Sequence, residues 1–372
     1  MDLPEWYESD YNQKFGYTER NALQLSKGKN GMKSMPAVKT SNALFETLKV
    51  LHPYLLRMLI WQDTRLLLDD SNPDAKLDRE TNLLKIFANT FIQLMPFMRS
   101  PLSDFHGELK NVRSVTKTIT SLLVGMVFGN DIIARLDDPI HIYFPETPAG
   151  DPKTGIRLKH LLSNTSGLPT IDDLKSMRQL LSTKNWLQTI LQYPLEDQPG
   201  HSYIYSSANF HLTTCLLERV LGSSLLQFAH ERLFQPLGIS EVFWECDPQG
   251  VPFGGSDLYL RPEDMLSIGK LCLENGKWNK RRIVPGAWLK LATQPIMRVD
   301  EKDQYGYGWW VDHNREITHL HTFSACGVGG QRIIIIPEKK AVAVTTSLTS
   351  LHAHSSVIDD AVFTYFSQPN TC

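Results

Sequence analysis

The sequence predicts a mixed α/β (α+β) fold in which strands from the two ends of the chain build one sheet, with a mainly helical subdomain inserted between them. Two observations predict this fold. Apolar runs typical of strands occur at 55–68 and again near the C-terminus. Residues 135–280 alternate helix-like patterns with turn clusters. The predicted division is therefore an N-terminal extension over 1–48, a sheet subdomain flanked by helices over 49–134 and 281–372, and the helical subdomain over 135–280.

The first elements are predicted from local patterns. Residues 1–48 are polar and mixed, which favours an extension lying on the surface. Apolar runs at 55–61 and 64–68 flank the short polar turn Gln62-Asp63, and this arrangement predicts a β-hairpin. Residues 78–102 alternate charged and apolar side chains at helix-like spacing, so we expect a helical insertion there.

The clearest helix begins at Val115. Its apolar side chains recur every three or four residues and form one buried stripe. The stripe consists of Val115, Ile119, Leu122, Leu123, Met126 and Val127. Gly129-Asn130 then gives a C-cap signal, so the helix is expected to end there.

The C-terminal part turns strand-rich. We expect strands at 307–312 and 318–323, and a hairpin formed by 332–336 and 341–346 around a polar turn. A final helix fits residues 354–366.

Composition excludes several classes of protein. With 38 Lys and Arg against 40 Asp and Glu in 372 residues, the chain has no overall positive field, so no nucleic-acid partner is expected. The first residues form no signal sequence, and no apolar run reaches the roughly 18 to 20 residues that span a bilayer. Five widely spread cysteines without a Cys-x-x-Cys pair favour reduced thiols. We therefore expect a cytoplasmic protein that makes no membrane contact.

The strongest chemical motif is Ser114-Val115-Thr116-Lys117, at the start of the striped helix. Residues three apart on a helix share a face, and the free N–H groups of a helix start favour a developing oxyanion. A lysine that acts as a base must move its pKa from about 10.4 toward 7, which takes roughly 4 to 5 kcal/mol of burial and positive potential. Chance alone gives about one such motif in a chain of this size. A second copy, Ser267 to Lys270, lies inside a predicted helix, and we interpret it as the chance match.

Two further segments carry candidate groups. Tyr205, Ser206 and Ser207 follow Pro199-Gly200 and precede a helical run; the tyrosine is suited to proton relay, although capping and packing explain most such stretches. The glycine-rich stretch 322–331 precedes a strand, and its glycines would allow close backbone approach to a ligand, although a plain hairpin is the simpler interpretation.

Metal and other hydrolase motifs have less support. His319-x-His321 and His352-x-His354 have no carboxylate or cysteine partner at metal-ligand spacing, so a structural role is preferred and no metal or other cofactor is expected. The sequence contains no Gly-x-Ser-x-Gly and no His-Glu-x-x-His motif.

Together the motifs resemble those of the serine β-lactamase and penicillin-binding-protein superfamily, over most of residues 50–365. Within it the chain is most similar to class C-type esterases and 6-aminohexanoate-dimer hydrolases. The motifs that carry the resemblance are Ser114-x-x-Lys117, Leu161-Leu162-Ser163-Asn164-Thr165-Ser166-Gly167-Leu168, Pro199-Gly200, Tyr205-Ser206-Ser207, Pro236-Leu237-Gly238, Tyr305-Gly306-Tyr307-Gly308-Trp309-Trp310 and the segment 323–331.

The resemblance implies a β-lactamase/transpeptidase-like fold with an antiparallel sheet, and roles for individual residues. Ser114 would be the acylated nucleophile, Lys117 its base and Tyr205 the proton relay. The remaining candidates for substrate or oxyanion binding are Ser207, Ala325, Cys326, Gly327 and Val328, the last four on an edge strand that adds one N–H to that of Ser114.

Two departures from the family pattern argue against β-lactamase or peptidoglycan peptidase activity. Ser207 stands where the tyrosine motif of β-lactamases has Asn, and the Lys-Thr-Gly of that family is missing, His321-Thr322-Phe323 coming nearest. The sequence therefore predicts a cofactor-independent serine hydrolase that cleaves an ester or amide of a small acyl substrate. The alternatives are an acyltransferase with the same acyl-enzyme, a β-lactamase or DD-peptidase, and a catalytically degenerate binding protein of the same fold. The sequence is compatible with a homodimer and does not determine the oligomeric state.

Overall fold

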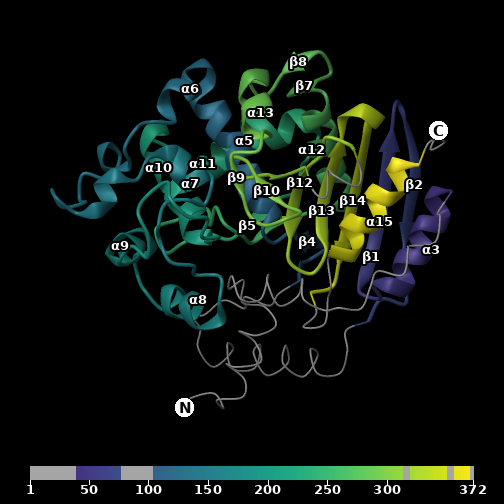
Figure 1. Ribbon diagram of the computed structural model, residues 1–372, viewed down its shortest axis with the longest axis horizontal. Helices are drawn as coiled ribbons and strands as arrows, with labels where there is room; N and C mark the ends of the chain where they lie inside the picture. The colour runs from purple at the N-terminus through teal and green to yellow at the C-terminus, as the bar shows by residue number, and fades with distance from the viewer. Residues whose placement is uncertain (1–38, 77–103, 313–318, 350–355, 369–372) are drawn as a thin grey trace, which may run out of the picture.

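The computed structural model describes residues 39–76, 104–312, 319–349 and 356–368 (Figure 1). The described residues form an eight-stranded sheet with the order β2-β1-β14-β13-β12-β11-β10-β9. The strands are β1 (Leu55–Gln62), β2 (Arg65–Ser71), β9 (Met297–Arg298), β10 (Gln304–Tyr305), β11 (Trp310–Val311), β12 (Phe323–Gly327), β13 (Gln331–Ile336) and β14 (Ala341–Ser347).

Strands from the N-terminal and C-terminal parts of the described chain pair with each other in this sheet. Strand β1 pairs antiparallel with β2 and with β14, so that Ile60 lies opposite Ala343. Strands β13 and β14 form the predicted hairpin around Pro337–Lys339. The predicted mixed α/β fold with an antiparallel sheet built from both termini is confirmed, as are both hairpins.

Helices cover the two faces of the sheet (Figure 1). On one face, α3 (Ser41–Leu51) and α15 (Ser356–Ser367) contact each other and enclose an apolar cluster with β1 and β14. On the other face, α5 (Val115–Phe128) packs against β12, and α12 (Pro262–Leu273) packs against β13 and β14. The larger cluster continues from this face into the helical region.

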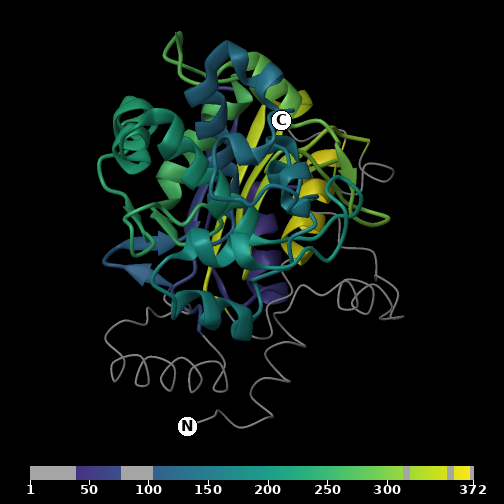
Figure 2. The same cartoon turned by 90° about the vertical axis from the view of Figure 1, so that its left-hand side faces the viewer.

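The helical region lies beside the sheet and faces the viewer in Figure 2. Its longest helix, α10 (Ser207–Leu221), packs against α5. The other helices of this region are α7 (Leu158–Leu162), α8 (Leu174–Leu181), α9 (Trp186–Gln192) and α11 (Leu225–Ala229), with the short helical turns η2 (Ile140–Ile142), η3 (Pro152–Gly155), η4 (His230–Phe234) and η5 (Gln235–Leu237). Outside this region, η1 (Gly129–Asp131) and α6 (Ile132–Arg135) follow α5, α13 (Gly286–Ala292) contacts α5, and η6 (Pro337–Lys339) lies between β13 and β14.

Two smaller β-structures complete the described part. A four-stranded sheet, β3-β4-β6-β5, joins the segment before α5 to the segment before α12. Its strands are β3 (Phe105–His106), β4 (Leu109–Asn111), β5 (Phe243–Trp244) and β6 (Leu258–Leu260), and a separate hairpin is formed by β7 (Lys277–Trp278) and β8 (Arg281–Arg282).

Several predicted boundaries differ from the structure. The extension expected over 1–48 includes the first residues of α3, whose Leu44, Phe45 and Leu48 are buried against the sheet. The strand predicted at 307–312 is only Trp310–Val311, because Gly308 has a positive φ of 82° and bends the backbone before it. The strand predicted at 318–323 begins only at Phe323. The helical insertion predicted at 78–102 lies outside the described residues, and the predicted subdomain boundaries stay predictions.

One helical stretch in the described part of the chain, Val115–Arg135, has the length and hydropathy of a membrane span. More than half of its most apolar window, 56%, is buried inside the protein. Helix α5, which begins this stretch, packs against β12, β13, α10 and α13, as a core helix does.

Candidate active site

Ser114 is the N-cap residue of α5, partly exposed at the end of a tightly fixed loop. The Arg113 N–H donates to Asn111 Oδ1 at 2.9 Å, and Arg113 has the unusual φ of 54°. On the other side of the loop, a Cβ on Gly327 would lie 2.4 Å from the Val112 carbonyl oxygen. Only glycine therefore lets β12 approach the backbone just before Ser114 this closely. The first N–H groups of α5, those of Val115, Thr116 and Lys117, already donate to the carbonyls of Val112, Arg113 and Ser114.

Lys117 is wholly buried one turn into α5, and its ammonium group contacts three oxygen atoms. The Nζ atom donates to Ser114 Oγ at 3.1 Å, to Ser207 Oγ at 2.8 Å and to the Gly255 carbonyl at 2.8 Å. The predicted pair Ser114 and Lys117 is thus in hydrogen-bond contact. The second copy of the motif lies inside α12, where Ser267 donates to the Glu263 carbonyl, as an ordinary helical serine does.

The environment of Lys117 favours its neutral form. Burial lowers the pKa of Lys117 to about 8, although the charges of Asp172 and Asp257 oppose this shift. The lysine therefore loses its proton within reach of neutral pH, which a general base requires. The face of the Tyr205 ring covers the ammonium group at 4.4 Å, a contact that stabilises the charged form.

Ser207 begins α10 and brings a carboxylate that the sequence did not single out. The Ser207 hydroxyl donates to Asp172 Oδ1 at 2.5 Å, and its N–H donates to Asp172 Oδ2 at 2.7 Å. The same Oδ1 atom lies 3.8 Å from Lys117 Nζ. Sequence reasoning missed Asp172 because 35 residues separate it from Ser207; the only local signal was an Asp172-Asp173 pair before a helix.

Gly255, the carbonyl partner of Lys117, was missed as well. A Cβ at Gly255 would lie 2.4 Å from the Ser207 Cβ, so a side chain there would separate α10 from the lysine. At the neighbouring Gly254 a Cβ would lie 2.2 Å from the Phe210 carbonyl. The Gly-Gly pair in an otherwise apolar stretch was the signal that could have pointed to this contact.

Tyr205 lies in the loop before α10, beside Lys117. Its ring stacks on Trp310 with centroids 6.3 Å apart, and Trp310 is the β11 residue opposite Ser324 of β12. The tyrosine motif, the lysine and the sheet therefore meet in one place. The face of the Tyr205 ring contacts Lys117, and the predicted relay role of the Tyr205 hydroxyl stays a prediction.

Asn164, from the predicted motif 161–168, holds the Tyr205 loop from both sides. Its backbone carbonyl accepts from Ile204 N–H at 2.8 Å, and its side-chain Oδ1 accepts from Ser206 N–H at 3.2 Å. Asn164 is fully buried and has a φ of 55°, a conformation that asparagine tolerates better than most residues.

The glycine-rich segment forms the end of β12 next to Ser114. Ala325, Cys326 and Gly327 belong to the strand, whereas Val328 follows it and is 39% exposed in a turn. The expected edge strand is wrong in one respect, since β12 lies between β11 and β13. Strand β11 is so short that it pairs only with Phe323 and Ser324, and it leaves the last three residues without a β11 partner. Burial raises the pKa of the Cys326 thiol, which favours the neutral form.

The family's Lys-Thr-Gly motif is replaced here by His321-Thr322-Phe323, so there is no lysine at that position, and Thr322 and Phe323 are buried. His321, which precedes them in the sequence, contacts Asp312, with Nδ1 and Oδ1 2.6 Å apart. His319 and His321 precede β12 and do not lie on a strand; His319 has a φ of 55°. His352 and His354 lie outside the described residues.

A second cluster of polar side chains is buried in the helical region. His211 and Cys215 lie one turn apart on α10, with Nε2 and Sγ 3.7 Å apart. His211 Nε2 is also 3.2 Å from Asp247 Oδ2, while Asp247 Oδ1 accepts from the N–H groups of Gln249 and Val251. All three side chains lie close enough together to hold a metal ion, a set that sequence reasoning missed, but an ion pair already explains their arrangement.

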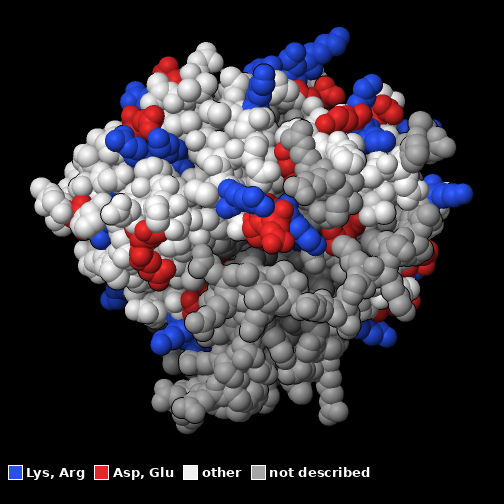
Figure 3. All heavy atoms as spheres, viewed as in Figure 1, with Lys and Arg blue, Asp and Glu red and all other residues white. Residues whose placement is uncertain are grey.

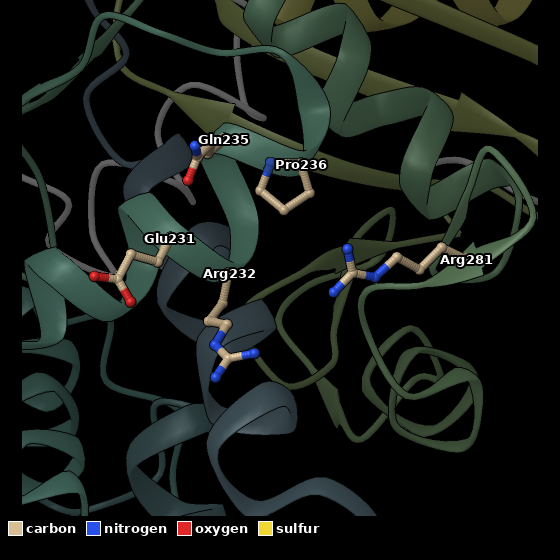
Figure 4. Close-up of a pocket in the computed structure, with 5 residues that line it drawn as sticks. All are labelled: Glu231, Arg232, Gln235, Pro236 and Arg281. Carbon is tan, nitrogen blue, oxygen red and sulfur yellow. The ribbon is translucent and has the colours of Figure 1, made fainter.

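The surface offers no single-sign field on the face shown in Figure 3, where basic and acidic side chains are interspersed. A hollow at η4 and η5 is lined by Glu231, Arg232, Gln235, Pro236 and Arg281 (Figure 4). Its lining includes none of the predicted site residues.

Residues 106–362 match the model of the Beta-lactamase family. Acyltransferase mokF of Monascus pilosus is 29% identical over 179 residues, which are 42% of this chain and 41% of that protein. Lovastatin esterase of Penicillium rubens is 31% identical over 147 residues, 35% of each chain. The β-lactamase of Escherichia coli is 33% identical over 143 residues, 36% of this chain and 34% of that protein. The chain thus matches about two fifths or less of the length of these relatives.

Solved structures share the fold. A Bacillus anthracis protein assigned as a 6-aminohexanoate-dimer hydrolase has a TM-score of 0.66 and 15% identity, covering 87% of this chain and 83% of its own. EstCE1, a hydrolase with promiscuous acyltransferase activity, has a TM-score of 0.64 and 19% identity, covering 87% of this chain and 97% of its own. At these identities the likeness concerns the fold.

Proposed function

This chain belongs to the Beta-lactamase family, and on that basis we propose that it is a serine hydrolase that cleaves an ester or amide of a small acyl substrate through an acyl-enzyme on Ser114. The observation that carries the proposal is the contact between Lys117 Nζ and Ser114 Oγ, at 3.1 Å, with the lysine buried. A nucleophile and a base within hydrogen-bond reach are the minimum for covalent catalysis.

The proposed reaction has two stages. Neutral Lys117 takes the proton of the Ser114 hydroxyl while Oγ attacks the carbonyl carbon, and the N–H of Ser114 with one N–H from the end of β12 stabilises the oxyanion. The bond to the leaving group then breaks, and Tyr205 relays the proton held by Lys117 to the departing oxygen or nitrogen, which leaves Lys117 neutral again. In the second stage neutral Lys117 takes a proton from the water that attacks the acyl-enzyme, and this proton passes to Ser114 Oγ as the acid is released.

The charges around Ser114 favour substrates without a carboxylate near the reacting bond. The negative charges of Asp172 and Asp257 interact with Lys117. His321 contacts Asp312, so it is not a free cation that could bind a carboxylate. An anionic substrate would be repelled by the carboxylates of Asp172 and Asp257, and the predicted site residues include no unpaired cation to bind it. We therefore propose neutral or cationic acyl substrates over β-lactams, and no metal or cofactor takes part in the proposed steps.

The test is a comparison of two serine variants that share the same local motif. Ser114→Ala should lower hydrolysis of a p-nitrophenyl ester panel by roughly 10³-fold or more, because the nucleophile is lost. The matched control, Ser267→Ala, removes the serine of the second Ser-x-x-Lys and should leave the rate within about twofold. Equal rates for Ser114→Ala and the unchanged protein would refute the proposal, as would failure of a fluorophosphonate probe to label Ser114.

Acyl transfer is a second candidate, supported by the relatives. One curated relative is named an acyltransferase, and a structural neighbour is described as a hydrolase with promiscuous acyltransferase activity. Both activities use the same acyl-enzyme and differ only in the nucleophile of the second stage. Product analysis with added amine or alcohol acceptors separates them, and hydrolysis products alone would exclude acyl transfer.

A further inference from the structure

The hydrogen bond from Ser207 to Asp172 fixes the direction of the Ser207 hydroxyl. A serine hydroxyl has a single hydrogen, and an ionised carboxylate only accepts. Because the short contact to Asp172 Oδ1, 2.5 Å, uses that hydrogen, Ser207 Oγ faces Lys117 with its lone pairs. Ser207 therefore accepts from Lys117 and has no hydrogen left to donate to it.

This direction has a consequence for the neutral lysine. Gly255 offers Lys117 a carbonyl oxygen, which is also an acceptor only. A neutral amine keeps two N–H groups, and the two obligate acceptors, Ser207 and Gly255, engage both of them. The one remaining direction, occupied by the amine lone pair, points to the third contact, the Ser114 hydroxyl at 3.1 Å.

From this geometry we propose that Asp172 is a positioning residue, which locks Ser207 as an acceptor and so aims the lone pair of neutral Lys117 at Ser114. The inference rests on the proposed function. An asparagine side chain at position 207, as the family motif has it, can present either its oxygen or its NH₂ group to the lysine. In this chain the serine and the carboxylate together remove that freedom.

The charge of Asp172 has an effect opposite to its positioning role, because it stabilises the protonated form of Lys117, which is not a base. The two effects can be separated by experiment. Two carboxylates, Asp172 and Asp257, stabilise the charged lysine, and the Tyr205 ring face does so as well. Replacing either aspartate by asparagine should therefore lower the pKa of Lys117. If charge alone mattered, both variants would be more active near neutral pH.

The experiment measures kcat/KM against pH from 6 to 10 with p-nitrophenyl butyrate for Asp172→Asn, with Asp257→Asn as the charge-matched comparison. Both variants should move the acid limb of the profile to lower pH. Only Asp172→Asn should also lower the plateau at high pH, by about 10- to 100-fold, because its NH₂ group can donate to Ser207 and turn the serine hydrogen toward the lysine. Thermal unfolding monitored by circular dichroism establishes that both variants are folded.

Two further variants separate positioning from general damage. Ser207→Ala should lower the plateau as well, and the double variant Ser207→Ala with Asp172→Asn should be no slower than Ser207→Ala alone, since both act through one contact. Ser207→Thr keeps the hydroxyl and should retain most of the plateau rate. If Asp172→Asn keeps the unchanged plateau, or if the two losses multiply, the positioning role is wrong.

Failure of this inference is distinguishable from failure of the proposed function. If the unchanged protein is not labelled at Ser114 by a fluorophosphonate, the acyl-enzyme itself is disproved. If Ser114 is labelled at the same high-pH rate in the unchanged protein and in Asp172→Asn, the acyl-enzyme stands and only the role of Asp172 falls.

Discussion

Lys117 donates a hydrogen bond of 3.1 Å to the Ser114 hydroxyl from one turn further along the same helix, and its side chain has no contact with bulk water. Burial lowers the pKa of Lys117 to about 8 against the opposing charges of Asp172 and Asp257. Below that pH the lysine holds its proton and is no base. We expect kcat/KM to rise about tenfold per pH unit at low pH and to level off near pH 8. A pH profile with p-nitrophenyl esters checks this, and a rate independent of pH between 6 and 9 would contradict it.

The same buried charge should lower the stability of the fold. The pKa of Lys117 is about 8 in the folded protein and 10.5 when unperturbed. Below pH 8 the lysine is therefore protonated in the folded and in the unfolded protein, and only the folded protein is destabilised by burying the charge. The shift corresponds to about 3 kcal/mol, and this cost disappears as the pH rises from 8 to 10.5.

Lys117→Met should therefore abolish activity and raise the free energy of unfolding at pH 7 by up to about 3 kcal/mol, less the cost of leaving Ser207 and Gly255 without a donor. Urea unfolding of both proteins measures the difference. Lys270→Met, in the second copy of the motif, is the control; it loses the contacts of the ammonium group with the Trp61 and Trp278 rings and should lower stability by about 0.5 to 1 kcal/mol. A difference in unfolding free energy between the two proteins that is the same at pH 7 and at pH 10.5 would contradict the expectation.

The parts of the fold that could be predicted from the sequence are those with local causes. The stripe from Val115 to Val127 defines one helix, and Gly129, with a φ of 58°, ends it where the C-cap signal indicated. The hairpin of β13 and β14 follows from two apolar runs around a polar turn. In each case the residues that form the sequence pattern and the residues that form the element lie within one segment of about 20 residues.

The parts that could not be predicted depend on contacts between distant segments. Asp172 reaches Ser207 across 35 residues, and Gly255 reaches Lys117 across 138. Neither residue belongs to a motif, and no periodicity indicates which loop folds over α5. The pair Ser114 and Lys117 could be predicted because its geometry is that of a single helical turn.

Asn164 should be required for the placement of Tyr205. Asn164→Gly keeps the positive φ without strain but removes the side-chain acceptor of Ser206 N–H, so we expect a loss of about 1 to 3 kcal/mol in stability and a fall in kcat. Asn164→Ala should cost about 1 kcal/mol more, since a Cβ without a polar group disfavours the left-handed conformation. Urea unfolding and ester hydrolysis of the two variants test this order. Equal stability of the glycine variant and the unchanged protein would show that the side chain does not hold the loop.

The buried pair of His211 and Asp247 should control stability at alkaline pH. Burial disfavours the charged imidazole, but the Cys215 sulfur and the Asp247 carboxylate outweigh it and raise the pKa of His211 to about 10. Since the ordinary value is 6.5, the pair stabilises the fold fully below pH 6.5, and this contribution is lost as the pH rises through 10.

Asp247→Asn removes the charge and leaves His211 buried without its counter-ion, so we expect a loss of about 3 to 5 kcal/mol at pH 6 and a smaller one at pH 10. Urea unfolding at both pH values measures the two losses. Cys215→Ser keeps the Asp247 carboxylate but removes the sulfur that also raises the pKa of His211, so it should cost less than Asp247→Asn. A destabilisation by Asp247→Asn that is the same at pH 6 and pH 10 would show that the two side chains do not form an ion pair in the folded protein.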